Sequence, residues 1–204
     1  MTYAIGDIHG CLEELIILIQ KLRLEKKDEL IFIGDYIDRG PDPKGVVDFL
    51  IKIRSYYKCI FIRGNHEQML LDYIMNDYKG SDWLLNGYES TMESYGNAIE
   101  NVPAGHIDFF NETKMYYKKN DFVFVHAGVR PNIRLEKQKM EDLLWIRSEF
   151  LNSENPLFNK KVVFGHTPFL NPFMTEYKIG IDTGCVFRGK LTAFRTDDYE
   201  IFQS

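Results

Sequence analysis

The sequence has few cysteines, no long hydrophobic run and no excess of basic residues, and each absence excludes a class of protein. Its 204 residues contain 3 cysteines, which are widely spaced and predict neither a disulfide framework nor a C-x-x-C zinc motif. No apolar run approaches the roughly 20 residues that cross a bilayer. No secretory leader with a charged and an apolar region is visible. We therefore expect a cytoplasmic protein in a reducing compartment, without a membrane partner.

The charge balance is mildly acidic, with a formal net charge of −5. Sequence-independent binding of nucleic acid needs a basic surface, so this balance argues against a nucleic-acid partner. The length is that of one large domain, and 45% hydrophobic residues is ordinary for a globular protein. Because no linker marks a boundary, we expect residues 1–204 to form a single domain. The sequence does not indicate the oligomeric state.

Strand and helix patterns alternate in the first half of the sequence. Apolar residues recur at helical spacing in Cys11–Leu22, and Lys44–Tyr57 has the same character after a turn rich in proline. Short apolar runs typical of strands occur at Thr2–Ile5, Glu29–Ile33, Cys59–Ile62, Phe122–Val125 and Val162–Phe164. This alternation predicts an α/β domain.

The C-terminal part has a different pattern. Three β-like runs, at Lys178–Asp182, Leu191–Arg195 and Tyr199–Phe202, follow one another with turns and no room for a helix. They predict an antiparallel meander. Elsewhere, His106 belongs to no motif, and we expect it to lie in a loop.

Polar residues come directly after five of the predicted strands, in the stretches "GDIHG", "GDYIDRG", "GNHE", "VHAG" and "GHT". Residues at the carboxyl ends of strands in an open α/β sheet converge on one crevice. The candidate ligands are Asp7, His9, Asp35, Asn65, His126 and His166. This set of carboxylates, an amide oxygen and imidazoles, without a thiolate, suits two divalent ions such as Mn, Fe or Zn. Two such ions need a bridging anion, and an aspartate can serve both.

Each stretch also has an ordinary interpretation. A lone Asp-x-His turn is more often a hydrogen-bonded pair than a metal site, and a single histidine after a strand is more often a core residue. The joint occurrence after five strands favours the metal site.

Together these blocks resemble the signature of the calcineurin-like metallophosphoesterases. The resemblance is to the phosphoprotein phosphatase branch, which includes small bacterial and phage serine/threonine protein phosphatases and symmetrical diadenosine tetraphosphate hydrolases. It extends over nearly the whole chain. It implies an α/β (α+β) fold in which a β-sandwich of two mixed sheets is flanked by helices, with a dinuclear metal site at the sheet ends.

The resemblance also implies a metal role for each matching residue. Asp7 and His9 match ligands of the first metal, Asp35 matches the bridging carboxylate, and Asn65, His126 and His166 match ligands of the second metal.

Four further residues match the groups that act on substrate. His66 matches the general acid and Asp38 its carboxylate partner, while Arg39 matches a phosphate-binding arginine. Arg147, in "LLWIRSEF", matches a second phosphate-binding arginine through a looser motif, whose alternative is an arginine on a helix surface. Asn65 is also expected to face the substrate.

Pro168 bears on the branch of the family and Tyr88 on the substrate, whereas Asp182 bears on structure. Pro168 stands in "GHTP" where many nuclease and phosphodiesterase relatives have a ligating histidine, so a nuclease is disfavoured. Tyr88 stands where the bacterial pattern "W..NGG..T..SY" has a second glycine, and its bulk is expected to reshape the wall facing the substrate. Asp182 is expected to stabilise the turn under the site.

The expected function is metal-dependent hydrolysis of phosphomonoesters by metal-activated hydroxide, as in a serine/threonine protein phosphatase with possible dual specificity. One alternative is a symmetrical dinucleoside tetraphosphate hydrolase, which shares every block. Another is an inactive phosphoprotein-binding domain. The expected cofactors are two divalent ions, manganese first, with Fe, Zn, Ni, Co or Mg as alternatives. The expected partner is a phosphoprotein, a phosphopeptide or a dinucleoside polyphosphate.

Overall fold

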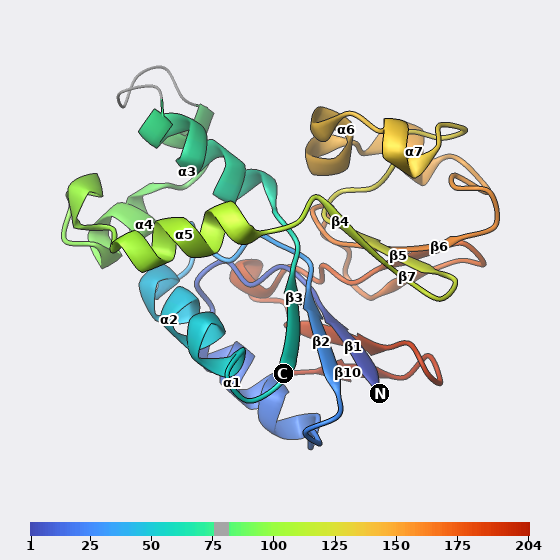
Figure 1. Cartoon of the computed structure of the whole chain (residues 1–204), viewed down its shortest axis with the longest axis horizontal. Helices are drawn as coiled ribbons and strands as arrows, with labels where there is room; N and C mark the ends of the chain where they lie inside the picture. The colour runs from blue at the N-terminus through green and yellow to red at the C-terminus, as the bar shows by residue number, and fades with distance from the viewer. Residues whose placement is uncertain (76–81) are drawn as a thin grey trace.

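The computed structural model describes residues 1–75 and 82–204, and within them the strands form two five-stranded mixed sheets (Figure 1). One sheet has the order β10–β9–β1–β2–β3, from strands Ile201–Gln203, Thr192–Arg195, Thr2–Ile5, Glu29–Phe32 and Lys58–Phe61. The other has the order β4–β5–β6–β8–β7, from strands Tyr116–Lys119, Phe122–Val125, Lys161–Phe164, Lys178–Gly180 and Phe173–Met174. The predicted fold class, two mixed sheets flanked by helices, is confirmed.

Helices flank both sheets. The α-helices are α1 (Leu12–Lys21), α2 (Pro43–Ile53), α3 (Asn65–Met75), α4 (Glu89–Ser94), α5 (Ala104–Glu112), α6 (Met140–Trp145) and α7 (Ser148–Leu151). Four short 3-10 helices in the described residues are η1 (Asp82–Leu85), η2 (Ile99–Asn101), η3 (Leu135–Lys137) and η4 (Cys185–Phe187). In Figure 1, α1, α2 and α5 lie beside the sheet that contains β1, and α6 and α7 lie beside the sheet that contains β5. None of the helices in the described ranges has the length and hydrophobicity of a membrane span.

Alternation along the strands explains how the two sheets pack. In β1, Ile5 points into the core shared with helices α1 and α2, whereas Ala4 points into the core between the sheets. In β5, Phe124 joins the core between the sheets and Val125 joins the core under α6 and α7. Successive side chains of a strand point to opposite faces, so each central strand supplies two cores.

Local chemistry sets the start of α2. The side chain of Asp42 accepts a hydrogen bond from the backbone N–H of Gly45 at 2.8 Å, and Pro43 occupies the first turn. An aspartate N-cap followed by proline is a favoured beginning for a helix because it satisfies a free donor and pre-sets the backbone. Helix α2 therefore begins directly after the "GDYIDRGP" loop and holds that loop in place.

The predicted C-terminal meander is wrong. Strand β8 lies in the second sheet, where it pairs with β6 in parallel and with β7 in antiparallel orientation. Of the three predicted runs, only the last two, β9 and β10, form an antiparallel hairpin, which extends the first sheet beside β1. The chain changes sheets in the loop between β8 and β9, and that loop contains Asp182 and η4.

The predicted loop position of His106 is also wrong. His106 lies in helix α5 and is buried, with the Tyr95 hydroxyl 2.8 Å from its Nδ1 and Asp48 Oδ1 3.0 Å from its Nε2. It is a hydrogen-bonded core residue, held between α2, α4 and α5.

Candidate metal centre and phosphate site

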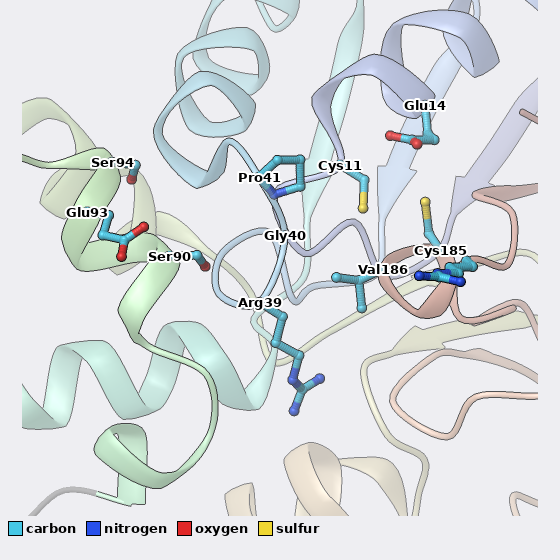
Figure 2. Close-up of a pocket in the computed structure, with 11 residues that line it drawn as sticks. Cys11, Glu14, Arg39, Gly40, Pro41, Ser90, Glu93, Ser94, Cys185 and Val186 are labelled. Atoms are coloured by element: carbon cyan, nitrogen blue, oxygen red, sulfur yellow. The ribbon is translucent and has the colours of Figure 1, made fainter.

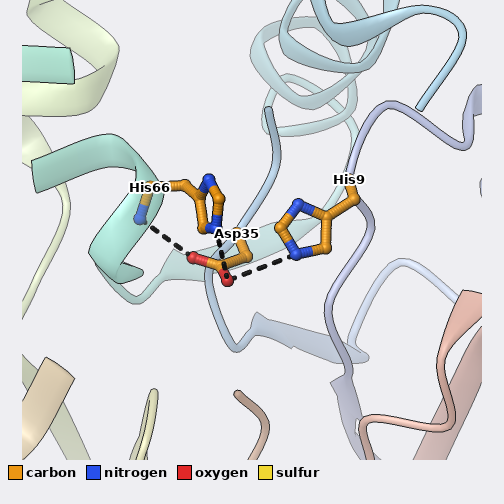
Figure 3. A group of neighbouring side chains, drawn as sticks. All are labelled: His9, Asp35 and His66. Atoms are coloured by element: carbon orange, nitrogen blue, oxygen red, sulfur yellow. Dashed lines mark hydrogen bonds and ion pairs between the residues drawn. The ribbon is translucent and has the colours of Figure 1, made fainter. Parts of the chain in front are cut away.

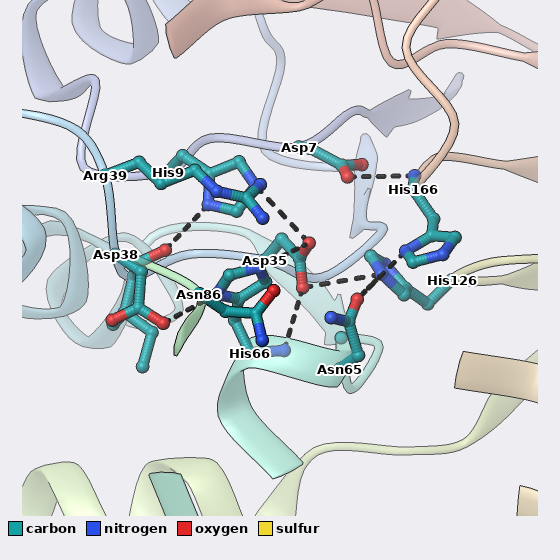
Figure 4. Close-up of polar contacts among 12 residues, drawn as sticks. Asp7, His9, Asp35, Asp38, Arg39, Asn65, His66, Asn86, His126 and His166 are labelled. Carbon is teal, nitrogen blue, oxygen red and sulfur yellow. Dashed lines mark hydrogen bonds and ion pairs between the residues drawn. The ribbon is translucent and has the colours of Figure 1, made fainter. Parts of the chain in front are cut away.

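The carboxyl ends of five strands bring the predicted ligands together. Strands β1, β2 and β3 run parallel, as do β5 and β6, so the loops that follow each set emerge on one side. The side chains that these loops place around one buried space are Asp7, His9, Asp35, Asn65, His126 and His166 (Figure 4). The convergence predicted from the sequence is therefore present in the structure.

The carboxylate of Asp35 lies at the centre of this group. Its Oδ2 is 3.4 Å from Nε2 of His9, and its Oδ1 is 3.4 Å from Nε2 of His126. Nε2 of His66 lies 3.9 Å from Oδ2 (Figure 3). The two oxygens thus face imidazoles on opposite sides, which is the geometry that a carboxylate shared by two cations requires.

Backbone carbonyls fix the orientation of two of these imidazoles. Nδ1 of His9 lies 2.8 Å from the carbonyl oxygen of Ile37, and Nδ1 of His126 lies 3.0 Å from that of Ile33. A carbonyl only accepts, so Nδ1 carries the proton in each ring and the neutral ring presents a lone pair at Nε2. That lone pair faces Asp35, as expected of a metal ligand positioned by its other nitrogen.

A second set of lone pairs converges beside Asn65. Its Oδ1 lies 2.8 Å from Nε2 of His126 and 3.0 Å from Nδ1 of His166. Within the described residues, Asp7 Oδ1 and His166 Nε2 are buried without a hydrogen-bond partner. Buried polar atoms without a partner are costly unless an ion or another group satisfies them. The donor set therefore fits divalent ions, and groups that contain Asp35 with His9 or with His126 can hold them.

Charge and burial act together on these groups. Burial raises the pKa of Asp7 well above its ordinary value, and the nearby carboxylates of Asp182 and Asp35 add to the effect. Burial acts in the same direction on Asp35, but the facing imidazoles of His126 and then of His66 outweigh it and hold its pKa well below the ordinary value. Burial lowers the pKa of His166 to about 2. His166 is therefore neutral, which is the state that a ligand needs.

The backbone at the site is strained. His9, Asp35, Asp38, Arg39 and His166 all have positive φ, between 45° and 70°. Residues other than glycine rarely adopt this left-handed backbone conformation, and it persists only where the surrounding structure enforces it. The glycines next to them permit close approach, since a Cβ on Gly165 would overlap Asp7 Oδ1.

His66 and Asp38 form a buried pair beside the ligands. Nδ1 of His66 lies 2.6 Å from Asp38 Oδ2. The indole N–H of Trp83 donates to the same oxygen at 2.9 Å, and the Thr91 hydroxyl donates to Asp38 Oδ1 at 2.5 Å. Nε2 of His66 has no hydrogen-bond partner in the described residues. The imidazole is thus fixed at one nitrogen, while the other remains available.

Two arginines line the same pocket, which has a volume of about 180 Å³. Arg39 points toward the ligands, with its Nη1 2.8 Å from Nε2 of His9. Arg147 lies between α6 and α7 and lines the pocket from the second sheet. It is therefore not an arginine on the outward face of a helix. The two guanidinium groups thus reach the pocket of the candidate ligands from different elements.

Pro168, Tyr88 and Asp182 have defined surroundings in the structure. Pro168 lines the pocket and offers no donor. Tyr88 packs its ring against Trp83, with ring centroids 5.5 Å apart, and is not among the residues that line the pocket, so the expectation that it shapes the wall facing the substrate is not supported. Asp182 is buried and accepts a hydrogen bond from the backbone N–H of Gly184 at 2.9 Å.

Three residues at the site were missed as functional candidates: Glu67, Trp83 and Thr91. Glu67 is buried and accepts hydrogen bonds from the backbone N–H groups of Asp35, Tyr36 and Gly64. Burial and the nearby Asp35 raise the pKa of Glu67 to about 8, but three donors directed at its oxygens favour the carboxylate. Glu67 ends the block "RGNHE", so its position next to His66 was the one sequence feature that could have identified it as a site residue.

Comparison with known proteins identifies the family of the chain. Residues 2–195 match the family model of the calcineurin-like phosphoesterases, so the chain belongs to the calcineurin-like metallophosphoesterase family. This makes it a hydrolase of a family that uses a dinuclear metal centre.

Two relatives carry different activities in their names. The bis(5'-nucleosyl)-tetraphosphatase PrpE (asymmetrical) of Oceanobacillus iheyensis is 30% identical over 225 residues, which cover 96% of this chain and 88% of the relative. Serine/threonine-protein phosphatase 1 of Salmonella typhimurium is 32% identical over 204 residues, which cover 95% of this chain and 91% of the relative. The comparison supports the family and leaves the substrate open.

Solved structures share the fold. One, provisionally assigned as a diadenosine tetraphosphatase, has a TM-score of 0.80 at 21% identity and covers 100% of this chain and 92% of its own. A cold-active protein tyrosine phosphatase has a TM-score of 0.72 at 19% identity and covers 99% of this chain and 78% of its own.

Proposed function

We propose that this chain, acting as one domain, binds two divalent metal ions and hydrolyses phosphate esters at the site around Asp35. Asp7 and His9 would hold the first ion, and Asn65, His126 and His166 the second. The observation that carries the proposal is the position of Asp35, whose two oxygens each lie 3.4 Å from a different imidazole. Two divalent cations held there lower the pKa of a bound water and offset charge on phosphate.

The residues around this centre supply the remaining chemistry. Arg39 and Arg147 bind phosphate oxygens through paired N–H donors from opposite walls, with Asn65 facing the same oxygens. His66 donates a proton from Nε2 to the leaving oxygen, and Asp38 holds its ring in the required orientation. No covalent enzyme intermediate is required.

The acid pair favours a phosphomonoester of an alcohol as substrate. An alkoxide is a poor leaving group unless it is protonated as it departs, whereas the phosphate released from an anhydride needs less help. We therefore propose a serine/threonine protein phosphatase, and similarity to serine/threonine-protein phosphatase 1 supports this choice. Manganese suits the mixed oxygen and nitrogen ligands. Three free cysteines are compatible with a reducing, cytoplasmic location.

A second candidate substrate is a dinucleoside tetraphosphate. A larger pocket of about 730 Å³ adjoins the phosphate pocket and shares Arg39, Cys185 and Val186 with it (Figure 2). At the boundary, Phe187 is 62% exposed and its ring centroid lies 5.8 Å from the Arg39 guanidinium. An exposed ring beside a phosphate-binding arginine offers a stacking surface for a base. The relatives named PrpE carry the asymmetrical designation, so both cleavage positions belong in the test.

One substrate panel separates the two candidates. Turnover of phosphoserine, phosphothreonine and phosphotyrosine peptides and of diadenosine tetraphosphate is measured with Mn²⁺, and the nucleotide products are identified. We expect metal-dependent release of phosphate from phosphoserine and phosphothreonine peptides. Turnover confined to the dinucleotide would overturn the protein phosphatase proposal while keeping the metal site. Inactivity on the whole panel with each of Mn, Ni, Co, Fe, Zn and Mg would favour a phosphoprotein-binding domain.

Phe187 offers a finer test of the second candidate. Phe187→Ala should lower kcat/KM for diadenosine tetraphosphate by roughly tenfold, since stacking of a base is worth about 1–3 kcal/mol. Phe187→Tyr, which keeps the ring, should retain most of the activity. Equal loss for p-nitrophenyl phosphate would argue against base stacking.

A further inference from the structure

A second cluster of possible metal ligands lies outside the centre around Asp35. Within the described residues, Cys11 Sγ, Cys185 Sγ and a carboxylate oxygen of Glu14 all lie within 4.8 Å of one another. Figure 2 shows the two thiols pointing toward each other, with the Glu14 carboxylate directed to the same space. The three residues come from two distant parts of the chain. Cys11 and Glu14 belong to the beginning of α1, and Cys185 begins η4.

The surroundings of this cluster are unusual for three ordinary side chains. Cys11 and Cys185 are buried, with 4% and 7% of their surface exposed, whereas Glu14 is half-buried. No hydrogen bond or ion pair engages the Glu14 carboxylate in residues 1–75 and 82–204. Its oxygens therefore meet the two sulfurs without a firm partner. A carboxylate and two thiols that face one small space form a donor set for a cation.

The cluster also has access to solvent. All three residues line the pocket of about 730 Å³ that adjoins the phosphate pocket. An ion entering from this pocket would meet the three protein ligands at its inner wall and keep a position toward solvent. Nothing in the proposed phosphatase mechanism uses these three side chains.

We infer that Cys11, Glu14 and Cys185 form a separate site for a zinc-class divalent cation. Two thiolates select a softer ion than the oxygen and nitrogen donors around Asp35, and a carboxylate as the third ligand favours Zn²⁺. Binding forms two metal–sulfur bonds and one metal–oxygen bond, and the two thiol protons pass to solvent. No oxidation or reduction is involved.

The bound ion would connect two loops that shape the phosphate pocket. Cys11 follows the loop that carries His9, and Cys185 precedes Val186 and Phe187, which line that pocket. Among the described residues, no strand pairing joins η4 to α1. Zn²⁺ should therefore raise the thermal stability of the protein by restraining η4.

Cobalt provides a direct test, because Co²⁺ bound to thiolate gives an intense sulfur-to-cobalt charge-transfer absorption in the near ultraviolet, and Co²⁺ bound to oxygen and nitrogen does not. Reduced full-length protein is titrated with Co²⁺ and then with Zn²⁺. We expect a charge-transfer band that Zn²⁺ abolishes. Cys185→Ser should lose the band, and Cys59→Ser, which changes the remaining cysteine, should keep it. Asp35→Asn should also keep it, so failure of the Asp35 centre and failure of this site are distinguishable.

Because Cys185→Ser could lose its charge-transfer band by failing to fold, Glu14→Gln serves as a second test of the same site. Substitution of a residue that only hydrogen-bonds to a metal ligand typically lowers metal affinity by about 10–100-fold. Loss of a direct ligand should therefore weaken Zn²⁺ binding by at least about tenfold. A missing charge-transfer band in the reduced wild-type protein would overturn the inference. So would a band that survives in Cys185→Ser, or unchanged Zn²⁺ affinity in Glu14→Gln. Spontaneous pairing of Cys11 with Cys185 as a disulfide in the purified protein, seen as a loss of two hydrogen masses and two reactive thiols, would also contradict it.

Discussion

Nδ1 of His66 lies 2.6 Å from Oδ2 of Asp38, and both side chains are buried. Trp83 and Thr91 donate hydrogen bonds to the Asp38 carboxylate, so its position is fixed from several sides. The carboxylate in turn fixes the imidazole of His66. This pair connects the loop after β2 with the beginning of α3 and places Nε2 of His66 3.9 Å from Asp35 Oδ2.

The first prediction concerns His66 as the general acid. His66→Asn should keep the metal ions but lower kcat by about 10²–10⁴-fold, the usual contribution of general acid catalysis. The loss should be larger for phenyl phosphate than for p-nitrophenyl phosphate, because the phenolate is the poorer leaving group. Metal analysis of the purified variant supplies the control. A uniform loss for both esters would contradict the acid role.

The second prediction concerns the hydrogen bonds that hold Asp38. The Thr91 hydroxyl donates to Asp38 Oδ1 at 2.5 Å and accepts from the Asp38 backbone N–H at 2.9 Å. Thr91→Val keeps the shape and removes both bonds, so the free energy of unfolding should fall by about 1–3 kcal/mol. Thr91→Ser retains the hydroxyl and should lose less. Denaturant unfolding of the two variants makes the comparison, and equal losses would indicate a packing effect.

A third prediction concerns the metal ions. Asp35→Asn should reduce bound metal and activity together, since the neutral amide is a poor bridge between two cations. Asp48 lies on α2 away from the centre, and its side chain is 53% exposed. Asp48→Asn removes the same charge there and should leave the metal content unchanged. Metal content after dialysis is the measurement. Full metal content in Asp35→Asn would contradict the bridging role.

A fourth prediction concerns the phosphate-binding arginine. Arg39→Lys should lower kcat/KM for p-nitrophenyl phosphate by roughly 10–100-fold, since lysine cannot make the paired N–H contacts and each bond to a charged group is worth about 1.5–3 kcal/mol. Arg188→Lys is the matched control, because Arg188 lines the adjoining pocket and not the phosphate pocket. An equal effect of the two substitutions would remove the special role of Arg39.

A fifth prediction uses the pKa of His106. Burial lowers this pKa below the ordinary value of 6.5, although Asp48 faces the ring. The unfolded chain therefore takes up the proton first as the pH falls, and the stability that His106 contributes is present above pH 6.5 and lost below it. The difference in unfolding free energy between wild type and His106→Gln should shrink from about pH 7.5 to about pH 5. A difference that grows toward acid would mean that the folded state binds the proton more tightly.

The positions of the candidate ligands at strand ends could be predicted because the signals for them are local. Each candidate ligand follows a short apolar strand within a few residues, so the sequence alone places Asp7, Asp35 and His126 at strand ends. Pairing between strands is a non-local property, and this is where prediction failed. The run at Lys178–Asp182 looks like its C-terminal neighbours, but β8 pairs with β6 in the other sheet.

The supporting residues were harder to predict for the same reason. Trp83 and Thr91 reach Asp38 across more than forty positions of the chain, with sequence separations of 45 and 53. His106 lies outside every motif, and only packing of α5 against α2 and α4 reveals its buried partners. Motifs identify groups that act on a ligand, whereas the residues that position those groups become visible only when the chain is folded.

The position of two metal ions on either side of Asp35 is the claim on which the proposed function depends. Anomalous diffraction from crystals of the manganese-loaded protein tests it most directly. We predict two anomalous peaks, one beside Asp7 and His9 and one beside Asn65, His126 and His166, with the Asp35 carboxylate between them. A single peak, or two peaks that Asp35 does not separate, would contradict the proposed centre.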